Sequence, residues 1–202
     1  MKTSLRKTKD PCEVCFLHKS FCICDQIPIL DIKTRISLVV HYKELKRTSN
    51  TGRLATTALI NSEMFIRGKL KEHATDLTPL IISDYENLLL YPSDDAEVLT
   101  PELVRGFMKP VHLIVPDGNW RQAAKVHSRH KELAQVKRVK LTPRLEATQF
   151  LRKEHIEGGM ATLEAIAEAM HVLEGAGTSK ALNDLYQLKL QTTLKARGLK
   201  TS

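Results

Sequence analysis

The stretch VHLIVPDGNW, residues 111–120, decides the fold that this sequence predicts. Its first five residues form an apolar, largely branched run that is typical of a buried strand. Pro116, Asp117 and Gly118 end the run, and from Asn119 the pattern becomes helical, with Trp120 and the basic residues on opposite sides. A buried strand that turns at once into a helix is the repeating unit of α/β folds.

Strands and helices are expected to alternate on either side of this stretch. Strand candidates are residues 34–42, 80–82, 87–91 and 136–141, and helix candidates are residues 53–64, a segment opened by Thr100-Pro101-Glu102, residues 163–175 capped by Thr162, and a last segment around residues 182–188. We therefore expect an α/β fold with a mainly parallel sheet and helices on both faces.

All four cysteines lie within the first 24 residues, at Cys12, Cys15, Cys22 and Cys24, in a C-x2-C-x6-C-x-C array. Four thiolates at this spacing are typical of one tetrahedral zinc site. Two disulfides or four unrelated thiols fit less well, because the start of the chain lacks the apolar core of a secretory leader. We expect residues 1–30 to form a small zinc knuckle and residues 31–202 to form the main domain.

The charge favours a polyanionic partner. The 202 residues carry 31 Lys and Arg against 23 Asp and Glu, a net charge of +8, and the isoelectric point is about 9.4. The basic residues gather in segments 2–9, 43–53, 121–131 and 137–144. This segregation favours nucleic acid. No apolar run reaches the ~20 residues of a membrane span, so we expect a cytoplasmic protein with no membrane contact and no obligate protein partner.

Ligands of parallel α/β sheets bind beyond the carboxyl ends of the strands, and two loops there carry suitable side chains. Residues 47–53 place Asn50, Thr51 and Gly52 between Arg47 and Arg53 at a helix start, which suits a phosphate or a carboxylate, or is a plain cap. Residues 116–120 place a carboxylate after a buried strand. Asp117 is then either a proton acceptor or a helix cap, and Trp120 either a core residue or a ligand contact.

A third candidate combines residues 141–144, 150–154 and 158–162, where glycines and a helix N-terminus free backbone groups for a small polar ligand. A surface loop explains its glycines equally well. The sequence contains neither a Walker loop nor a G-x-G-x-x-G motif, so no nucleoside triphosphate or Rossmann signature is present.

Four segments in this order resemble the DTW-domain family. They are the cysteine array, HYKELKRTSNTGRL (residues 41–54), VPDGNWRQA (residues 115–123), and FLRKE followed by ATLEA (residues 150–154 and 161–165). The resemblance spans about Cys12 to Gly175, and its specificity lies in the combination. This chain departs from the family pattern at two positions, with Asn119 in place of Thr and Ala161 in place of Ser.

The resemblance implies a tRNA-uridine aminocarboxypropyltransferase, related to the SPOUT class and carrying a C-terminal trefoil knot. Such an enzyme moves the 3-amino-3-carboxypropyl group of S-adenosylmethionine to N3 of a uridine, forming acp3U and releasing 5'-methylthioadenosine. The alternatives are a SPOUT-type S-adenosylmethionine-dependent RNA methyltransferase and a zinc-containing protein that binds RNA without catalysis.

The implied roles fall on residues already singled out. Asp117 is the expected catalytic residue. The donor site is expected to comprise Asn50, Thr51, Gly52, Pro116, Gly118, Trp120, Leu141, Thr142, Ala161 and Thr162, the tRNA contacts Arg47, Arg53, Arg121, Lys125 and Arg152, and the structural zinc ligands Cys12, Cys15, Cys22 and Cys24.

Overall fold

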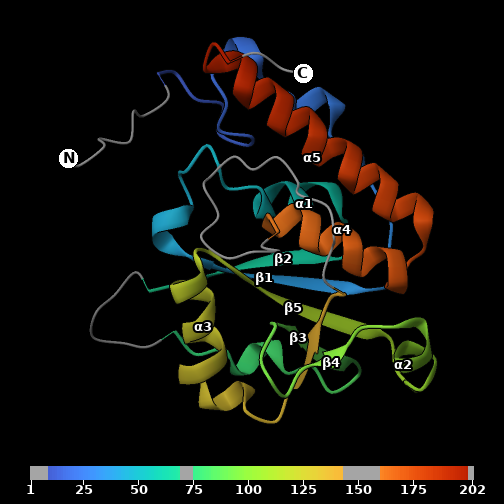
Figure 1. The fold of residues 1–202 in the computed structure, drawn as a ribbon. Coiled ribbons are helices and arrows are strands. Elements are labelled where there is room, and N and C mark those ends of the chain that lie inside the picture. Colours follow the sequence, from blue (N-terminus) through green and yellow to red (C-terminus); the bar gives the residue numbers. More distant parts are fainter. Residues whose placement is uncertain (1–8, 69–74, 143–159, 200–202) are drawn as a thin grey trace.

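The computed structural model describes residues 9–68, 75–142 and 160–199, which form one sheet with helices packed against it (Figure 1). The strands are β1 (Arg35–His41), β2 (Ser62–Arg67), β3 (Glu86–Leu90), β4 (Glu97–Val98), β5 (Val111–Asp117) and β6 (Lys137–Lys140). The helices are α1 (Gly52–Ala58), α2 (Pro101–Arg105), α3 (Trp120–Arg129), α4 (Thr162–Leu173) and α5 (Ala176–Ala196). Short 3-10 turns are η1 (Lys19–Phe21), η2 (Cys24–Gln26), η3 (Tyr42–Glu44), η4 (Thr78–Leu80) and η5 (Lys131–Leu133).

The six strands lie in the order β2-β1-β5-β3-β6-β4, and every neighbouring pair is parallel. This confirms the predicted parallel α/β sheet. The quoted stretch lies in its middle, since β5 pairs with both β1 and β3. Val40 of β1 is the register partner of Asp117, so the carboxyl ends of β1 and β5 meet at one edge.

Alternate residues of the central strands pack into two separate hydrophobic cores. Leu38 and Leu113 belong to the larger core, beneath α1, α4 and α5, whereas Val39 and Ile114 belong to the smaller one, beside α3. Figure 1 shows these helices on opposite faces of the sheet. Because both faces of β1 and β5 are covered, these strands are continuous apolar runs in the sequence.

Two local predictions were wrong. The helix expected over residues 53–64 ends at Ala58, and residues 62–67 form β2 beside β1. The hydroxyl of Ser62 donates to the carbonyl of Leu59 at 2.6 Å, so a side chain satisfies a group that a continuing helix would use. Residues 78–80 form η4, and residues 80–82 lead into β3 instead of forming a strand of their own. Thr162 is the first residue of α4 and not its cap, which is Ala161.

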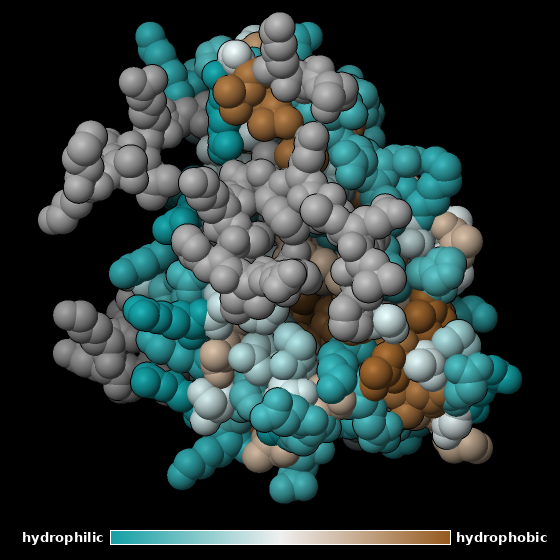
Figure 2. Space-filling model, in the orientation of Figure 1, coloured by the Kyte–Doolittle hydropathy of each residue, from teal (hydrophilic) through white to brown (hydrophobic). Residues whose placement is uncertain are grey.

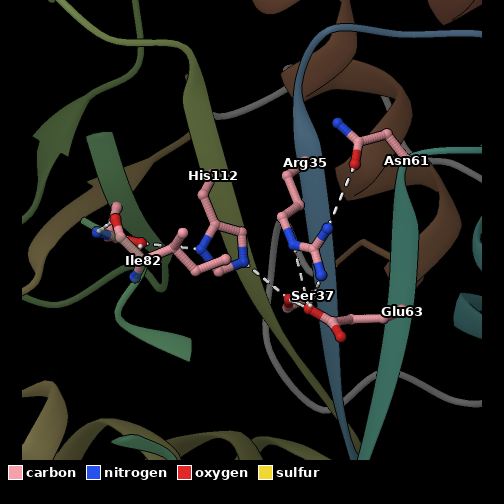
Figure 3. A network of polar contacts seen from close by, with 7 residues as sticks. Arg35, Ser37, Asn61, Glu63, Ile82 and His112 are labelled. Carbon is pink, nitrogen blue, oxygen red and sulfur yellow. Dashed lines mark hydrogen bonds and ion pairs between the residues drawn. The ribbon is translucent and has the colours of Figure 1, made fainter. Parts of the chain in front are cut away.

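A buried polar network joins the amino-terminal parts of four strands, β1, β2, β3 and β5 (Figure 3). The fully buried His112 of β5 contacts Asn87 Oδ1 through Nδ1 at 2.9 Å and the Ser37 hydroxyl through Nε2 at 2.7 Å. The Ser37 hydroxyl also lies 2.9 Å from Glu63 Oε1, to which Arg35 donates at 2.6 Å.

Proton counting defines the neutral form of this histidine. The amide nitrogen of Asn87 donates to the carbonyl of Ile82, so its oxygen is the acceptor and His112 Nδ1 must carry a proton. Nε2 is then an acceptor that competes with Glu63 for the hydroxyl proton of Ser37. Burial, and secondarily the charge of Arg35, lowers the pKa of His112 to about 4. The network therefore pins β5 to β1 and β3 at the end opposite Asp117.

Within the described residues, no helix combines the length and apolar character that crossing a bilayer requires.

Candidate active site

Asp117 is the last residue of β5 and its carboxylate is held from two sides. Only 4% of the residue is exposed. The side-chain nitrogen of Asn50 donates to Oδ2 at 2.5 Å, and the Thr162 hydroxyl donates to Oδ1 at 2.6 Å. Charge-assisted hydrogen bonds of this length are the strong ones. One carboxylate thus joins the loop before α1 to the first turn of α4.

The starts of α1 and α4 are built to make these contacts. The side-chain oxygen of Asn50 accepts from the backbone N–H of Arg53 at 3.3 Å, which satisfies a free N–H in the first turn of α1 and orients the amide nitrogen of Asn50 toward Asp117. The Thr51 hydroxyl accepts from the backbone N–H of Leu163 at 3.3 Å. A helix therefore starts at the predicted place, and the loop before it contacts a second helix.

Gly52 is required by the close approach of these elements. A Cβ atom placed on it would lie 3.0 Å from Thr162 Cγ2, 3.1 Å from Asp117 Cγ and 3.1 Å from Leu38 Cδ2. These distances are shorter than ordinary carbon contacts of about 3.5–4.0 Å. Any larger residue would press on the threonine and the aspartate of the site.

The turn from β5 to α3 is fixed by a reciprocal cap. The Asn119 side chain accepts from the backbone N–H of Gln122 at 3.0 Å, and the Gln122 side chain accepts from the backbone N–H of Asn119 at 2.7 Å. Gly118 has a φ of +156°, and a Cβ there would lie 2.6 Å from Gln122 Oε1. Asn119 and not Asp117 is therefore the cap of α3, and Trp120, its first residue, is half-buried.

The other residues that were predicted to bind the donor lie on or after different strands of the sheet. Pro116 is half-buried in β5, opposite Val39. Leu141 and Thr142 follow β6, which is separated from β5 by β3. The backbone N–H of Ala161 donates to the Glu164 side chain at 3.1 Å; having no hydroxyl, Ala161 forms only this half of a capping box.

A shallow hollow lined by Val40, Leu45, Asn50, Arg53 and Met64 has no interior that a water molecule could occupy. Pockets for small molecules usually measure ~300–1,000 Å³. This hollow alone is thus too small for a nucleoside donor. The predicted candidates Arg152, Arg144, Phe150–Glu154 and Gly158–Gly159 lie outside the described residues.

Basic residues surround this edge of the sheet in different environments. Arg121 and Lys125 are exposed on α3, in a region where hydrophilic residues predominate in Figure 2. Arg47 pairs with the buried Glu44 at 3.4 Å. Arg53 is half-buried, and it donates to the carbonyl of Leu45 at 3.3 Å. Arg121 and Lys125 are therefore the best placed of the four to meet a polyanion.

Sequence reasoning missed Arg67, which lies buried at the end of β2 and donates to the backbone carbonyl of Gln122 in α3. Burial lowers its pKa. Burial also lowers the pKa of the neighbouring His41, and the charges of Arg67 and Lys43 add to that effect. The sequence did not reveal Arg67 as the end of a strand, because residues 62–64 were predicted to belong to a helix.

The four cysteines come together as the spacing predicts. Their sulfur atoms all lie within 4.8 Å of one another, with separations of 3.5 Å for Cys12–Cys24, 3.5 Å for Cys12–Cys22 and 3.9 Å for Cys15–Cys22. Zinc–sulfur bonds of about 2.3 Å in a tetrahedron separate the sulfur atoms by about 3.8 Å. The four thiols are not joined in disulfides. Their arrangement fits one tetrahedral metal ion.

The thiol charges are unequal without a metal. Burial raises the pKa of Cys12, but hydrogen bonds from the backbone of Cys15 and Val14 and from neighbouring thiols lower it to about 6. Burial and the neighbouring thiols raise the pKa of Cys24. One thiolate thus forms readily and discourages the next, a conflict that a bound divalent cation removes.

The cysteine segment packs directly on the rest of the chain. Cys15, Leu17 and Ile23 belong to the larger hydrophobic core. The Phe16 ring lies 4.1 Å from the guanidinium carbon of Arg53. Lys189 of α5, fully buried, donates to the carbonyl of Cys15 at 2.6 Å. Burial lowers the pKa of Lys189 to about 8, and the charges of the nearby thiols act in the opposite direction.

The comparison with protein families agrees with these motifs, because the model of the DTW domain matches residues 9–194. The chain belongs to the DTW-domain family. The resemblance seen in the sequence is thereby confirmed, and the match includes the cysteine segment and all three elements that meet at Asp117.

Three relatives of this DTW-domain protein share one name. The tRNA-uridine aminocarboxypropyltransferase 2 of Drosophila melanogaster is 30% identical over 173 residues, which cover 82% of this chain and 67% of that protein. The protein of that name in Mus musculus is 25% identical over 81% of this chain and 56% of its own length. The one in Macaca fascicularis is 23% identical over 83% and 58%. The chain thus spans little more than half of the two mammalian relatives. No solved structure matches this DTW-domain protein significantly.

Proposed function

We propose that this DTW-domain protein transfers the 3-amino-3-carboxypropyl group of S-adenosylmethionine to N3 of a uridine in tRNA. N3 attacks the carbon of that group that is bonded to sulfur, and the carbon–sulfur bond breaks. Its electron pair returns to sulfur, the product base is acp3U, and the leaving group is 5'-methylthioadenosine. The observation that carries the proposal is the meeting of Asn50, Asp117 and Thr162, from three separate motif segments, in one hydrogen-bonded unit.

Asp117 is the proposed acceptor of the N3 proton, or the group that orients N3–H. Uridine N3–H is a weak acid, and its attack on a sulfonium-activated carbon needs an acceptor held in line. The amide of Asn50 and the hydroxyl of Thr162 hold the carboxylate in one orientation. A fixed acceptor of this kind avoids reorganisation during the reaction.

The donor is proposed to lie along the same edge of the sheet. Asn50, Thr51 and Gly52 would hold its carboxylate at the start of α1, or a phosphate of the RNA. Backbone groups near Pro116, Gly118, Leu141, Thr142, Ala161 and Thr162 would hold its adenosine.

The tRNA is proposed to contact the basic residues of this edge. Arg47, Arg53, Arg121, Lys125 and Arg152 are the candidates, and phosphate contacts of this kind position the RNA without reading its sequence. Trp120 or the part-exposed Tyr42 would stack on a base that leaves the tRNA fold. Lys43 Nζ lies 5.7 Å from the Tyr42 ring centre, an arrangement that suits stacking beside a phosphate.

Cys12, Cys15, Cys22 and Cys24 are proposed to hold one structural zinc ion. The support is the separation of their sulfur atoms, which matches a tetrahedral site. The same proposal includes a relation to the SPOUT class, a trefoil knot and a cytoplasmic location. The knot would involve residues 143–159, which lie outside the described residues.

Product analysis tests the reaction. tRNA is incubated with the protein and S-adenosylmethionine, and its nucleosides and the small-molecule products are measured by mass spectrometry. The proposal expects acp3U with an equal amount of 5'-methylthioadenosine. A methylated nucleoside with S-adenosylhomocysteine would establish the methyltransferase alternative instead.

Asp117→Asn tests the role of the carboxylate. General acid–base groups contribute about 10²–10⁴-fold, so we expect turnover to fall by at least about 100-fold while tRNA affinity is largely kept. Asp184→Asn is the matched control, because Asp184 is exposed on α5 and pairs only with Lys180 at 2.6 Å among the described residues. Full turnover in Asp117→Asn would overturn the assignment, and unchanged cellular tRNA function without any turnover would support the non-catalytic RNA binder.

A further inference from the structure

Two cations lie beside the cysteine cluster, on helices far from it in the sequence. Lys189 of α5 is fully buried, and its ammonium donates to the carbonyl of Cys15. Arg53 of α1 lies against the ring of Phe16, the residue that follows Cys15 in the sequence. The described residues contain no ion pair within 4.0 Å for either side chain.

A buried ammonium without a counter-ion is costly, so its position needs an electrostatic reason. The thiols supply one. The ammonium of Lys189 is bonded to the backbone of Cys15, and the guanidinium of Arg53 lies against the ring of Phe16, so both cations lie beside the thiol cluster. Asp117 also favours the charged form of Arg53, ahead of the thiols of Cys12 and Cys15. Four thiolates around one divalent zinc ion carry a net charge of −2, and Lys189 and Arg53 together carry +2.

The cysteine loop is shaped to bring Arg53 to the cluster. Phe16 has a left-handed backbone with a φ of +55°, a conformation that is strained for a bulky residue. Its N–H donates to the carbonyl of Cys12 at 3.0 Å, which closes the turn between the first two cysteines. This turn presents the ring to the guanidinium. Arg53 also supplies the N–H that donates to the side chain of Asn50, and Asn50 holds Asp117.

We propose that Lys189 and Arg53 are the two counter-charges of a zinc tetrathiolate, and that metal loading thereby fixes the first turn of α1, which presents Asn50 to Asp117. Both are positioning residues. The inference rests on the zinc centre of the proposed function and is independent of the transfer reaction. The metal would thus help to order the site around Asp117, although none of its ligands belongs to that site.

Zinc affinity is the first measurement. The full chain is stripped of metal, and zinc is titrated in competition with a chromophoric chelator. Partners outside the ligand set typically contribute 10–100-fold to metal affinity, so Lys189→Met and Arg53→Met are each expected to weaken zinc binding by about 10-fold or more. Lys180→Met is the control, because Lys180 is exposed on the same helix and pairs with Asp184.

Cobalt substitution separates a charge effect from a loss of ligands. The thiolate-to-cobalt absorption of both variants is expected to keep the wild-type shape and intensity at saturation, with only the affinity reduced. Arg53→Met also guards against misfolding of Lys189→Met, because Arg53 is only half-buried. Wild-type affinity in both folded variants would overturn the inference.

Hydrogen exchange tests the link to the site. Removal of zinc from the wild-type chain is expected to raise amide exchange in residues 52–55 by about 10-fold or more beyond any rise in residues 111–115 of β5, which report the global stability of the chain. Exchange in residues 52–55 that rises no more than in residues 111–115 would overturn the link. A wild-type chain that binds no zinc would overturn both the metal centre and this inference, whereas the product analysis decides the transfer reaction separately.

Discussion

Gly52→Ala is the most direct test of how tightly the site is assembled. In an open helix this change stabilises a protein by about 0.4–1 kcal/mol, because the unfolded chain loses freedom. At Gly52 the added methyl group would lie 3.0–3.1 Å from Thr162, Asp117 and Leu38. Overpacking of a well-packed site costs about 1–3 kcal/mol. The balance is a net destabilisation of roughly 1–2 kcal/mol.

Gly177→Ala is the matched control. Gly177 lies in the first turn of α5, and a Cβ there would meet no atom within 4 Å. This variant is expected to gain stability by about 0.4–1 kcal/mol. Urea unfolding followed by circular dichroism measures both free energies, and the two variants should lie on opposite sides of the wild type.

Activity provides a second readout for the same pair. The methyl group of Gly52→Ala would push on both partners of the 2.6 Å bond between Thr162 and Asp117. Because misplacements of about 1 Å cost up to ~100-fold in rate, a shift of a few tenths of an ångström should reduce turnover by about 10-fold, with little change in tRNA affinity. A Gly52→Ala protein that is as stable as Gly177→Ala and fully active would refute the packing described here.

Three further predictions concern the metal, the buried histidine and the RNA. Metal analysis should find about one zinc per chain, and a chelator should lower the melting temperature because the metal-bound state is the folded one; an unaffected melting curve would contradict a structural zinc. The pKa of His112 is about 4 in the folded chain against about 6.5 when unfolded, so stability should be full above pH 6.5 and fall by roughly 3 kcal/mol toward pH 4. Urea unfolding at several pH values measures this loss of unfolding free energy, and His112→Gln should lack the part that His112 causes. If the stability of His112→Gln falls with pH as steeply as that of the wild type, other groups cause the loss. Arg121→Ala and Lys125→Ala should each weaken tRNA binding and reduce the slope of log affinity against log salt concentration by about 1. Arg105→Ala on α2 is the control and should leave this slope unchanged. Equal slopes for all three variants would show that α3 does not contact the tRNA.

Much of the fold could be predicted because the central strands carry their own signal. β1 and β5 are buried on both faces, so their sequences are apolar throughout. β2 gave no such signal, since it lies at the sheet edge and most of its residues are only partly buried. Its helical spacing continued that of α1, and only pairing with β1 shows that the chain becomes a strand. Because β2 was not predicted, Arg67 at its end was not predicted either.

The candidate site was predicted in its residues but not in its contacts. The sequence indicated Asn50, Asp117 and Thr162 separately, as caps or as ligands, and periodicity cannot show that they bond to one another across 67 and 45 residues. Lys189 is different. It falls on the same helical stripe as Leu182, Leu185 and Tyr186, and a charged residue on an apolar stripe is a visible signal for a buried charge.

The bond between Lys189 and Cys15 spans 174 residues of chain. At a synthesis rate of about 5–20 residues per second, the cysteines leave the ribosome roughly 9–35 s before the helix on which they dock. During that interval the nascent thiols have neither their counter-charge nor their hydrophobic cover, and they are open to oxidation and to capture of the wrong metal. The cysteine segment is thus translated well before it can mature, and, if it holds zinc as proposed, zinc supply during translation becomes a determinant of the yield of native protein.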